Sequence, residues 1–262
     1  MSKTQAAFQN RKAFIPFITA GDPDLETTLQ LIPAMARAGA DLIEIGIPFS
    51  DPVAEGEVIQ RADIRALQGG VTIDHIFSMV KQLRKICDIP LAFMTYINPV
   101  YVYGAEKFLN ECALCKIDAL IVPDMPFEEK EELNPLCKKY GVDLISLIAP
   151  TSEKRILKIA KEAQGFLYCV SSMGVTGVRS KISTDISKMT ALAKSVSSMP
   201  VAVGFGISTP QQARQMAQHA DGVIVGSAIV RLCEQYGKDC IAPICRYIEE
   251  MKAALSCSSD TV

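Results

Sequence analysis

The chain has 262 residues, of which 49% are hydrophobic, and its formal net charge at pH 7 is −2. It can bury one large core, and because no Gly/Ser-rich linker divides it, we expect a single domain over residues 1–262 with a disordered tail at 256–262. The balanced charge offers no basic surface for nucleic acid, and no apolar run approaches the ~20 residues needed to span a bilayer.

Short apolar strands alternate with amphipathic helical segments along the whole chain. The strand patterns are FIPFITA (14–20), DLIEIGIP (41–48), PLAFMTY (90–96), ALIVPD (119–124), DLISLIAP (143–150), FLYCVS (166–171), PVAVGFG (200–206) and GVIVGSA (222–228). Each is followed by a helical pattern. Eight such units in about 260 residues are typical of a (β/α)8 TIM barrel, and the G-x-G-x-x-G motif of an open doubly wound sheet is absent. The second unit is the longest, so it must carry an extra segment between residues 51 and 72.

The second strand contains a carboxylate, Glu44, within an almost continuous apolar run. A strand of that pattern is covered on both faces, so Glu44 must be desolvated, paired or catalytic. One interpretation is a structural carboxylate that is hydrogen-bonded to neighbouring backbone. The acidic loop that follows, with Asp51, Glu55 and Glu57, favours the catalytic interpretation, because active sites of TIM barrels lie at the C-terminal ends of the strands.

A long glycine-bearing loop, SSMGVTGVRSKIST at residues 171–184, follows the sixth strand. With Gly174 and Gly177 as flexible points, it is suited to close over a ligand and exclude water. The alternative is an ordinary mobile surface loop.

Glycines also end the last two strands, at Gly206 and Gly226, and Ser227 opens the segment after the eighth. Glycines let backbone N–H groups approach an anion closely, and the N-terminus of a helix favours negative charge. Tight turns alone would also explain these glycines, but their occurrence on adjacent final strands favours phosphate binding. We therefore predict a TIM barrel of the phosphate-binding type.

Other chemistries are disfavoured by the remaining residues. The two histidines, His75 and His219, lie in helical patterns away from strand ends, so we expect neither a Ser-His-Asp triad nor a metal site. The nine cysteines are scattered, and most of them fall within apolar patterns, which is typical of reduced core residues in a cytosolic protein. The N-terminal segment lacks the apolar region of a secretion signal, so we expect a cytoplasmic location.

Five segments resemble motifs of the tryptophan synthase α subunit family, in the order that the family has them. They are PFITAGDP (16–23), EIGIPFSDP (44–52), GVTG (174–177), GFGIS (204–208) and GSAIV (226–230). The resemblance covers nearly the whole chain. It implies a barrel that cleaves indole-3-glycerol phosphate to indole and glyceraldehyde 3-phosphate, in tryptophan biosynthesis.

The resemblance also implies roles for individual residues. It makes Glu44 the principal acid–base residue and places Glu55 at the position of the second catalytic acid. The implied substrate contacts are Phe17 and Tyr168 at the indole, Gly177, Gly206, Gly226 and Ser227 at the phosphate, and Thr176 on the lid as a hydrogen-bond partner of the second acid.

The segment that carries the second acid departs from the family pattern. The family has DP-[LV]-A-D-G-P-x-I-Q, whereas this chain has DPVAEGEVIQ, with Glu55 for the aspartate and Glu57 for the proline. An extra methylene moves the carboxylate by roughly 1 Å, and a displacement of that order can cost about 10²-fold in rate. One hypothesis is therefore that catalysis is impaired. The other is that Glu55 adopts a different rotamer and works adequately.

The resemblance further implies a partner, a pyridoxal-phosphate-dependent β subunit in an α2β2 heterotetramer, with no cofactor in this chain. The apolar segment 97–103 at the predicted rim agrees with an interface, although an amphipathic helix packed on the barrel would also explain it. With Glu55 and Glu57 in mind, an alternative function is a weakened α subunit that acts mainly as an allosteric activator of the β subunit. A different phosphate-binding barrel of the same pathway is disfavoured by the lack of matching catalytic lysine motifs.

Overall fold

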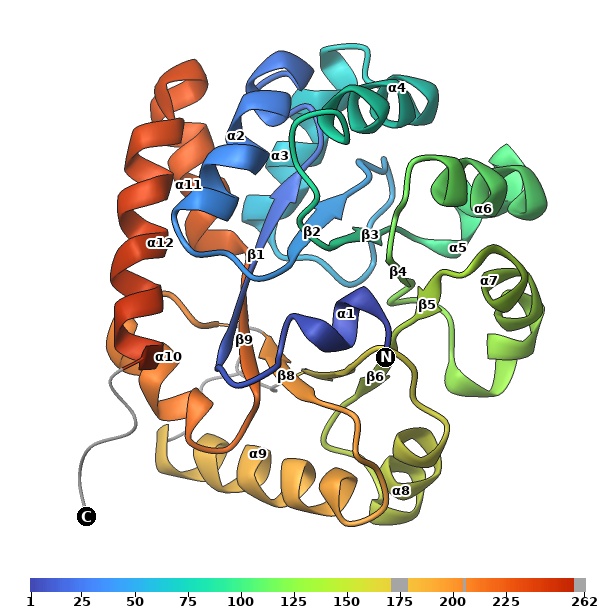
Figure 1. Cartoon of the computed structure of the whole chain (residues 1–262), viewed down its shortest axis with the longest axis vertical. Helices are drawn as coiled ribbons and strands as arrows, with labels where there is room; N and C mark the ends of the chain where they lie inside the picture. Colours follow the sequence, from blue (N-terminus) through green and yellow to red (C-terminus); the bar gives the residue numbers. More distant parts are fainter. Residues whose placement is uncertain (171–178, 205, 257–262) are drawn as a thin grey trace.

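The computed structural model describes residues 1–170, 179–204 and 206–256. Nine parallel strands form one sheet in the order β5-β4-β3-β2-β1-β9-β8-β7-β6 (Figure 1). Their bounds are β1 (Ala13–Thr19), β2 (Ile43–Gly46), β3 (Leu91–Met94), β4 (Ala119–Ile121), β5 (Asp143–Leu144), β6 (Ser146–Ile148), β7 (Leu167–Val170), β8 (Val201–Gly204) and β9 (Gly222–Val225).

The sheet closes into a barrel through a break in the fifth predicted strand. Strands β5 and β6 are the two parts of the segment 143–150, separated only by Ile145. The first part pairs with β4 and the second with β7, so this segment joins the two ends of the strand order and closes the ring. The predicted TIM barrel is confirmed, with one of its eight strands divided in two.

Helices surround the strands (Figure 1). They are α1 (Lys3–Ala6), α2 (Leu25–Arg37), α3 (Glu57–Gln68), α4 (Ile73–Leu83), α5 (Ile97–Tyr103), α6 (Ala105–Leu114), α7 (Asn134–Tyr140), α8 (Glu153–Lys161), α9 (Arg179–Lys194), α10 (Pro210–Ala217), α11 (Ser227–Tyr236) and α12 (Ile241–Ser256), with short 3₁₀ helices η1 (Phe127–Glu132) and η2 (Gly237–Asp239). In the described part of the chain no helix has the length and apolarity to cross a membrane.

Two sequence-based boundaries were wrong. Helix α9 begins at Arg179, so the loop predicted for 171–184 extended too far into the helix. Ser256, which we assigned to the tail, is the last residue of α12, and residues 257–262 lie outside the described part of the chain. The predicted extra segment between 51 and 72 is confirmed, because α3 precedes the helix α4 that continues the second unit.

Polar side chains at the predicted turns start several of these helices. Asp24, Thr72 and Thr209 accept hydrogen bonds from the third backbone N–H of α2, α4 and α10. These bonds satisfy N–H groups that lack a partner inside the helix. The helices therefore begin where the strand–turn–helix pattern of the sequence predicts.

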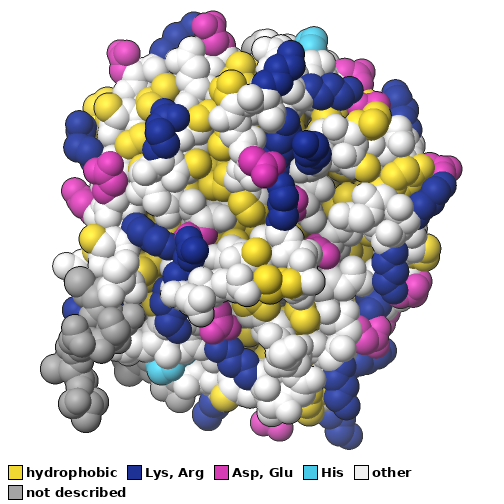
Figure 2. Space-filling view, viewed as in Figure 1, with side chains coloured by type: hydrophobic (Ala, Val, Ile, Leu, Met, Phe, Trp, Pro, Cys, Tyr) yellow, Lys and Arg dark blue, Asp and Glu magenta, His cyan; other side chains and the backbone are white. Residues whose placement is uncertain are grey.

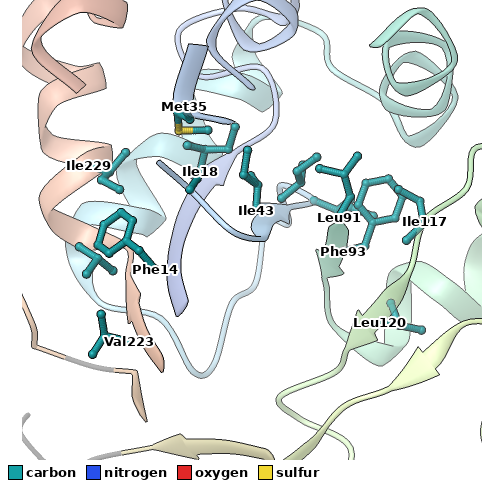
Figure 3. Close-up of a cluster of buried hydrophobic side chains, with 14 of the residues drawn as sticks. Phe14, Ile18, Met35, Ile43, Leu91, Phe93, Ile117, Leu120, Val223 and Ile229 are labelled. Carbon is teal, nitrogen blue, oxygen red and sulfur yellow. The ribbon is translucent and has the colours of Figure 1, made fainter. Parts of the chain in front are cut away.

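Alternate strand residues fill two separate cores. In β1, Phe14 and Ile18 belong to the outer cluster between strands and helices, whereas Ile15 belongs to the cluster inside the barrel. Figure 3 shows part of the outer cluster, where strand side chains meet Met35 of α2 and Ile229 of α11. Side chains alternate across a strand, so every second residue of each strand faces the barrel interior.

The short N-terminal helix α1 covers the end of the barrel where the strands begin, in the centre of Figure 1. Thr4 donates a hydrogen bond to Asp143 at the start of β5, and the Phe8 and Phe166 rings are 5.5 Å apart. Figure 2 shows basic and acidic side chains interspersed over this face. Because this end is occupied, an accessible interior site must lie at the opposite end.

Candidate active site

A cavity of about 380 Å³ opens at the C-terminal ends of the strands. Its lining draws on β1, β2, β3, β7, β9, the loop after β2 and the start of α11. The lining residues are Phe17, Glu44, Ala54, Glu55, Gly56, Ile59, Met94, Tyr168, Gly206, Ile207, Ser208, Ile224, Gly226, Ser227, Ala228 and Arg231. The structure thus brings the described site residues that we predicted from the sequence around one cavity. Thr176 and Gly177 lie outside the described residues.

Glu44 is the buried acid of this cavity. It lies between Phe17 on β1 and Ala92 on β3 in the strand register and is fully buried, with 0% exposure. Within the described part of the chain, neither of its carboxyl oxygens has a hydrogen-bond partner. Burial disfavours the charged form and raises the pKa of Glu44 to about 8. A structural carboxylate would be paired with backbone donors, so the geometry favours a carboxyl that acts on a ligand.

Two aromatic rings form the walls beside Glu44. Phe17 is buried on β1, and Tyr168 reaches the same cavity from β7. Burial raises the pKa of Tyr168 well above its usual range, and the nearby Glu44 adds to that shift, so the phenol stays neutral. A Cβ at Gly46 would lie 2.6 Å from Phe17 Cζ, and one at Gly204 would lie 2.4 Å from Tyr168 Oη. Glycine at these two positions therefore makes room for the rings.

Glu55 reaches the cavity from the loop between β2 and α3. Two contacts hold the backbone of this loop. The N–H of Ala54 donates to the hydroxyl oxygen of Tyr96 at 3.0 Å, and the Gln60 side chain donates to the Glu55 carbonyl at 2.8 Å. Burial raises the pKa of the Glu55 carboxyl, and a hydrogen bond from Asp63 partly offsets this shift. Glu55 is thus a partly desolvated acid on a loop whose backbone is fixed.

Asp63, which our sequence analysis missed, does not line the cavity but interacts with Glu55, which does. It is buried on α3 between Ala62 and Ala66, and only 3% of it is exposed. Burial raises its pKa to about 9, and the charge of Glu55 adds to the shift. The sequence held a signal, because residues 59, 62, 63 and 66 lie on one face of a helix and the acid at 63 is on that apolar face.

The opposite end of the cavity has the features of an anion site. Gly226 precedes α11 and Ser227 is its first residue, so backbone N–H groups of this helix end are unpaired within the helix. Gly206 has a φ of +74°, which favours glycine, and it also lines the cavity. Arg231 adds a cation from the next turn of α11. The pattern of residue types at this end suits a phosphate group.

The apolar segment 97–103 divides into a packed side and an exposed side. It forms α5, in which Val100 is fully buried, whereas 46% of Tyr101 and 81% of Val102 are exposed. The interpretation as an amphipathic helix packed on the barrel therefore accounts for the buried face of the segment. The other face leaves apolar side chains in solvent.

Comparison with known proteins identifies the family. The family model of the tryptophan synthase alpha chain matches residues 3–256. The tryptophan synthase alpha chain of Lacticaseibacillus casei is 48% identical over 97% of this chain and 96% of its own length, and that of Halalkalibacterium halodurans is 50% identical over 88% of each. The crystal structure of tryptophan synthase subunit alpha from Legionella pneumophila str. Paris, 35% identical, superposes with a TM-score of 0.88 over 98% of this chain and 99% of that one. By sequence, fold and the arrangement of this cavity, the chain belongs to the tryptophan synthase alpha chain family.

Proposed function

We propose that this chain cleaves indole-3-glycerol phosphate by a retro-aldol reaction to indole and glyceraldehyde 3-phosphate. The observation that carries the proposal is Glu44, a fully buried carboxyl with no hydrogen-bond partner in the described part of the chain, on the wall of a cavity of about 380 Å³. Membership of the family supports the same reaction.

Glu44 carries the proton transfers in this proposal. The bond between indole C3 and the first glycerol carbon breaks, C3 receives a proton, and the hydroxyl on that glycerol carbon loses one as it becomes the aldehyde. With a pKa of about 8, the Glu44 carboxyl is protonated at neutral pH, so it can donate to C3 and then accept the hydroxyl proton. One carboxyl acting twice leaves the enzyme in its starting protonation state.

The other residues of the cavity bind and orient the substrate. Phe17 and Tyr168 hold the indole ring, and the Glu55 carboxylate stabilises positive charge that develops at the indole nitrogen. Gly206, Gly226 and Ser227 hold the phosphate through backbone N–H groups, and Gly177 adds to that site. The family resemblance implies Thr176 as a further hydrogen-bond partner of Glu55.

A β subunit is the proposed partner, in an α2β2 heterotetramer, and pyridoxal phosphate belongs to that subunit. Exposed apolar side chains support a docking surface, with Val53 exposed by 80%, Val102 by 81% and Tyr101 by 46%. The cysteines in the described ranges are all free thiols, which supports a reducing, cytoplasmic compartment.

The direct test is indole release from indole-3-glycerol phosphate by the purified chain, with and without a cognate β subunit. Glu44→Gln keeps the shape of the side chain and removes proton transfer, so indole release should fall by at least about 10²-fold. Glu249→Gln, on the exposed face of α12, is the matched control and should retain the parent rate. If the parent protein releases no indole either with or without the β subunit, the proposal is refuted.

A further inference from the structure

We propose that Asp63 is a positioning residue that stays protonated at neutral pH and donates a hydrogen bond to the Glu55 carboxylate, which fixes that carboxylate in the cavity. The inference rests on the proposed function, because Glu55 is the acid that it positions. Residue 63 lies neither at a strand end nor in a segment that resembles a family motif.

The first support is an unsatisfied oxygen. Glu55 Oε2 is buried, and no N–H or hydroxyl donor reaches it in the described part of the chain. The side chain that interacts with the Glu55 carboxyl is Asp63, which is itself buried. Two carboxylates would place acceptor against acceptor in a desolvated site. A proton on one of them turns that contact into a hydrogen bond and removes one of the two buried charges.

Burial decides which carboxyl keeps the proton. Asp63 is 3% exposed and lies within a helix, whereas Glu55 is half-buried on a loop at the cavity. The more desolvated group pays more for ionising, so the proton stays on Asp63 and the charge stays on Glu55. Burial raises the pKa of both carboxyls, to about 9 for Asp63, where the charge of Glu55 adds to the shift, whereas the hydrogen bond from Asp63 partly offsets the rise for Glu55.

The other groups around Asp63 do not neutralise it. The backbone of Phe49 and the Thr19 hydroxyl on β1 face its carboxyl, and both favour the charged form, but burial and Glu55 outweigh them. Tyr96, between β3 and α5, is a further titratable neighbour, and burial raises its pKa to about 12, which keeps it neutral. The arginines on the same helix are engaged elsewhere, Arg61 with Glu234 and Arg65 with Asp22.

Helix α3 is rigidly mounted, which makes Asp63 suitable for positioning. Arg65 donates two hydrogen bonds of 2.8 Å to Asp22, whose side chain is 1% exposed, at the loop after β1. Arg61 donates two to Glu234 on α11. On the inner side, Ala62 packs with Phe17 and Val230. A donor on such a helix has a fixed place relative to the barrel.

The hydrogen bond from Asp63 compensates for the replacement of the family's aspartate by the longer side chain of Glu55. A glutamate has one more rotatable bond than an aspartate, so its carboxylate is less restricted by its own backbone. The Asp63 hydrogen bond supplies the missing restriction from the opposite side. Of the two hypotheses drawn from the sequence, this supports the one in which Glu55 works with a different side-chain geometry.

Two substitutions of Asp63 distinguish a role in positioning Glu55 from a role in folding alone. Asp63→Asn keeps a donor but cannot lose a proton, so turnover should stay within about threefold of the parent. Asp63→Ala removes the donor, so kcat should fall at least about tenfold with KM changed much less, as expected for misorientation of a catalytic group. Parent-like kcat in a folded Asp63→Ala variant would overturn the proposal.

The pH profile gives a readout that a merely structural residue would not move. In the parent, Glu44 and Asp63 both lose protons at alkaline pH, so log(kcat/KM) should fall with a slope approaching about −2 above pH 9. In Asp63→Asn the slope should be about −1. Glu57→Gln removes an exposed carboxylate from the same helix and should keep the parental slope. An unchanged slope in Asp63→Asn would contradict the proposal.

A measurement without substrate keeps this inference separable from the proposed function. In the parent labelled with ¹³C at aspartate and glutamate carboxyls, NMR should show a carboxyl that remains protonated at pH 7 and disappears in Asp63→Asn. If that signal is present but no indole is released, the proposed function fails and the proton-sharing pair stands. If Asp63 titrates near the ordinary aspartate value, the pair is refuted whatever the lyase rate.

Discussion

The hydroxyl oxygen of Tyr96 accepts a hydrogen bond from the backbone N–H of Ala54 and thereby joins the end of β3 to the loop that carries Glu55. The Tyr96 ring also packs against Phe49, with centroids 5.5 Å apart. The hydroxyl and the ring therefore hold the loop through different contacts, which a single-atom deletion can separate.

Tyr96→Phe should lower kcat/KM about twofold to tenfold. The substitution keeps the ring contact and removes one hydrogen bond, whose net value is about 0.5–1.5 kcal/mol. Steady-state indole release measures the effect. Tyr140→Phe is the matched control, because its hydroxyl donates to Glu106 on the outside of the barrel. Equal rates for Tyr96→Phe and the parent would show that the Ala54 contact does not position the loop.

Glu55→Asp should lower turnover about tenfold, although it restores the residue type of the family pattern. The shorter side chain withdraws its carboxylate by roughly 1 Å from Asp63 and from the cavity. Indole release at saturating substrate measures this effect, with Glu57→Asp, an exposed position of the same segment, as the control. A rise in turnover would mean instead that Glu55 impairs catalysis, as the first hypothesis from the sequence holds.

Ser227→Asp should raise KM at least about tenfold while the free energy of unfolding stays equal or increases slightly. A carboxylate at the first position of α11 interacts favourably with the helix dipole, by about 0.3–1 kcal/mol, but repels a phosphate dianion at the same place. Kinetics and denaturant unfolding measure the two effects. Ser152→Asp, at the start of α8 outside the cavity lining, should leave KM unchanged. An unaltered KM in Ser227→Asp would show that the substrate phosphate does not bind at the start of α11.

Glu44→Gln should flatten the pH dependence of stability. The native state raises the pKa of this carboxyl from 4.5 to about 8, so it binds more protons than the unfolded chain between those values. The free energy of unfolding contributed by Glu44 therefore falls as pH rises through that window. Relative to the parent, the variant should gain up to about 1.4 kcal/mol for each pH unit between pH 5 and pH 8. Urea unfolding at several pH values measures the difference, and parallel curves would show that Glu44 titrates normally.

The barrel and most of its cavity could be predicted because their signals are local. Strand patterns repeat with helical patterns, and a carboxylate within a buried strand marks Glu44 directly. The division of the fifth strand could not be predicted, because the run 143–150 has the pattern of one continuous strand and the change of partner at Ile145 depends on ring closure.

Two other features depend on tertiary contacts. The first turns of α9, from Arg179, contain polar and β-branched residues of modest helix propensity, so the sequence does not mark the start of the helix. Ile186 and Met189 are buried further along the helix, and this tertiary packing stabilises it. Asp63 comes close to Glu55 only because α3 packs against Phe17 of β1 and Val230 of α11. Its neighbour Glu55 is eight positions away on a loop, so neither residue alone predicts the pair.

The position of all three acids within one βα unit has a consequence for how such a site can change in evolution. Glu44, Glu55 and Asp63 all lie between residues 44 and 63, whereas the described residues of the phosphate end, Gly206, Gly226 and Ser227, all follow residue 200. Exchange of the segment 41–70 between relatives would thus transfer all three acids together and leave the phosphate-binding residues of the recipient unchanged. The recipient would need Asp22 and Glu234, because these residues form ion pairs with Arg65 and Arg61 of the exchanged segment.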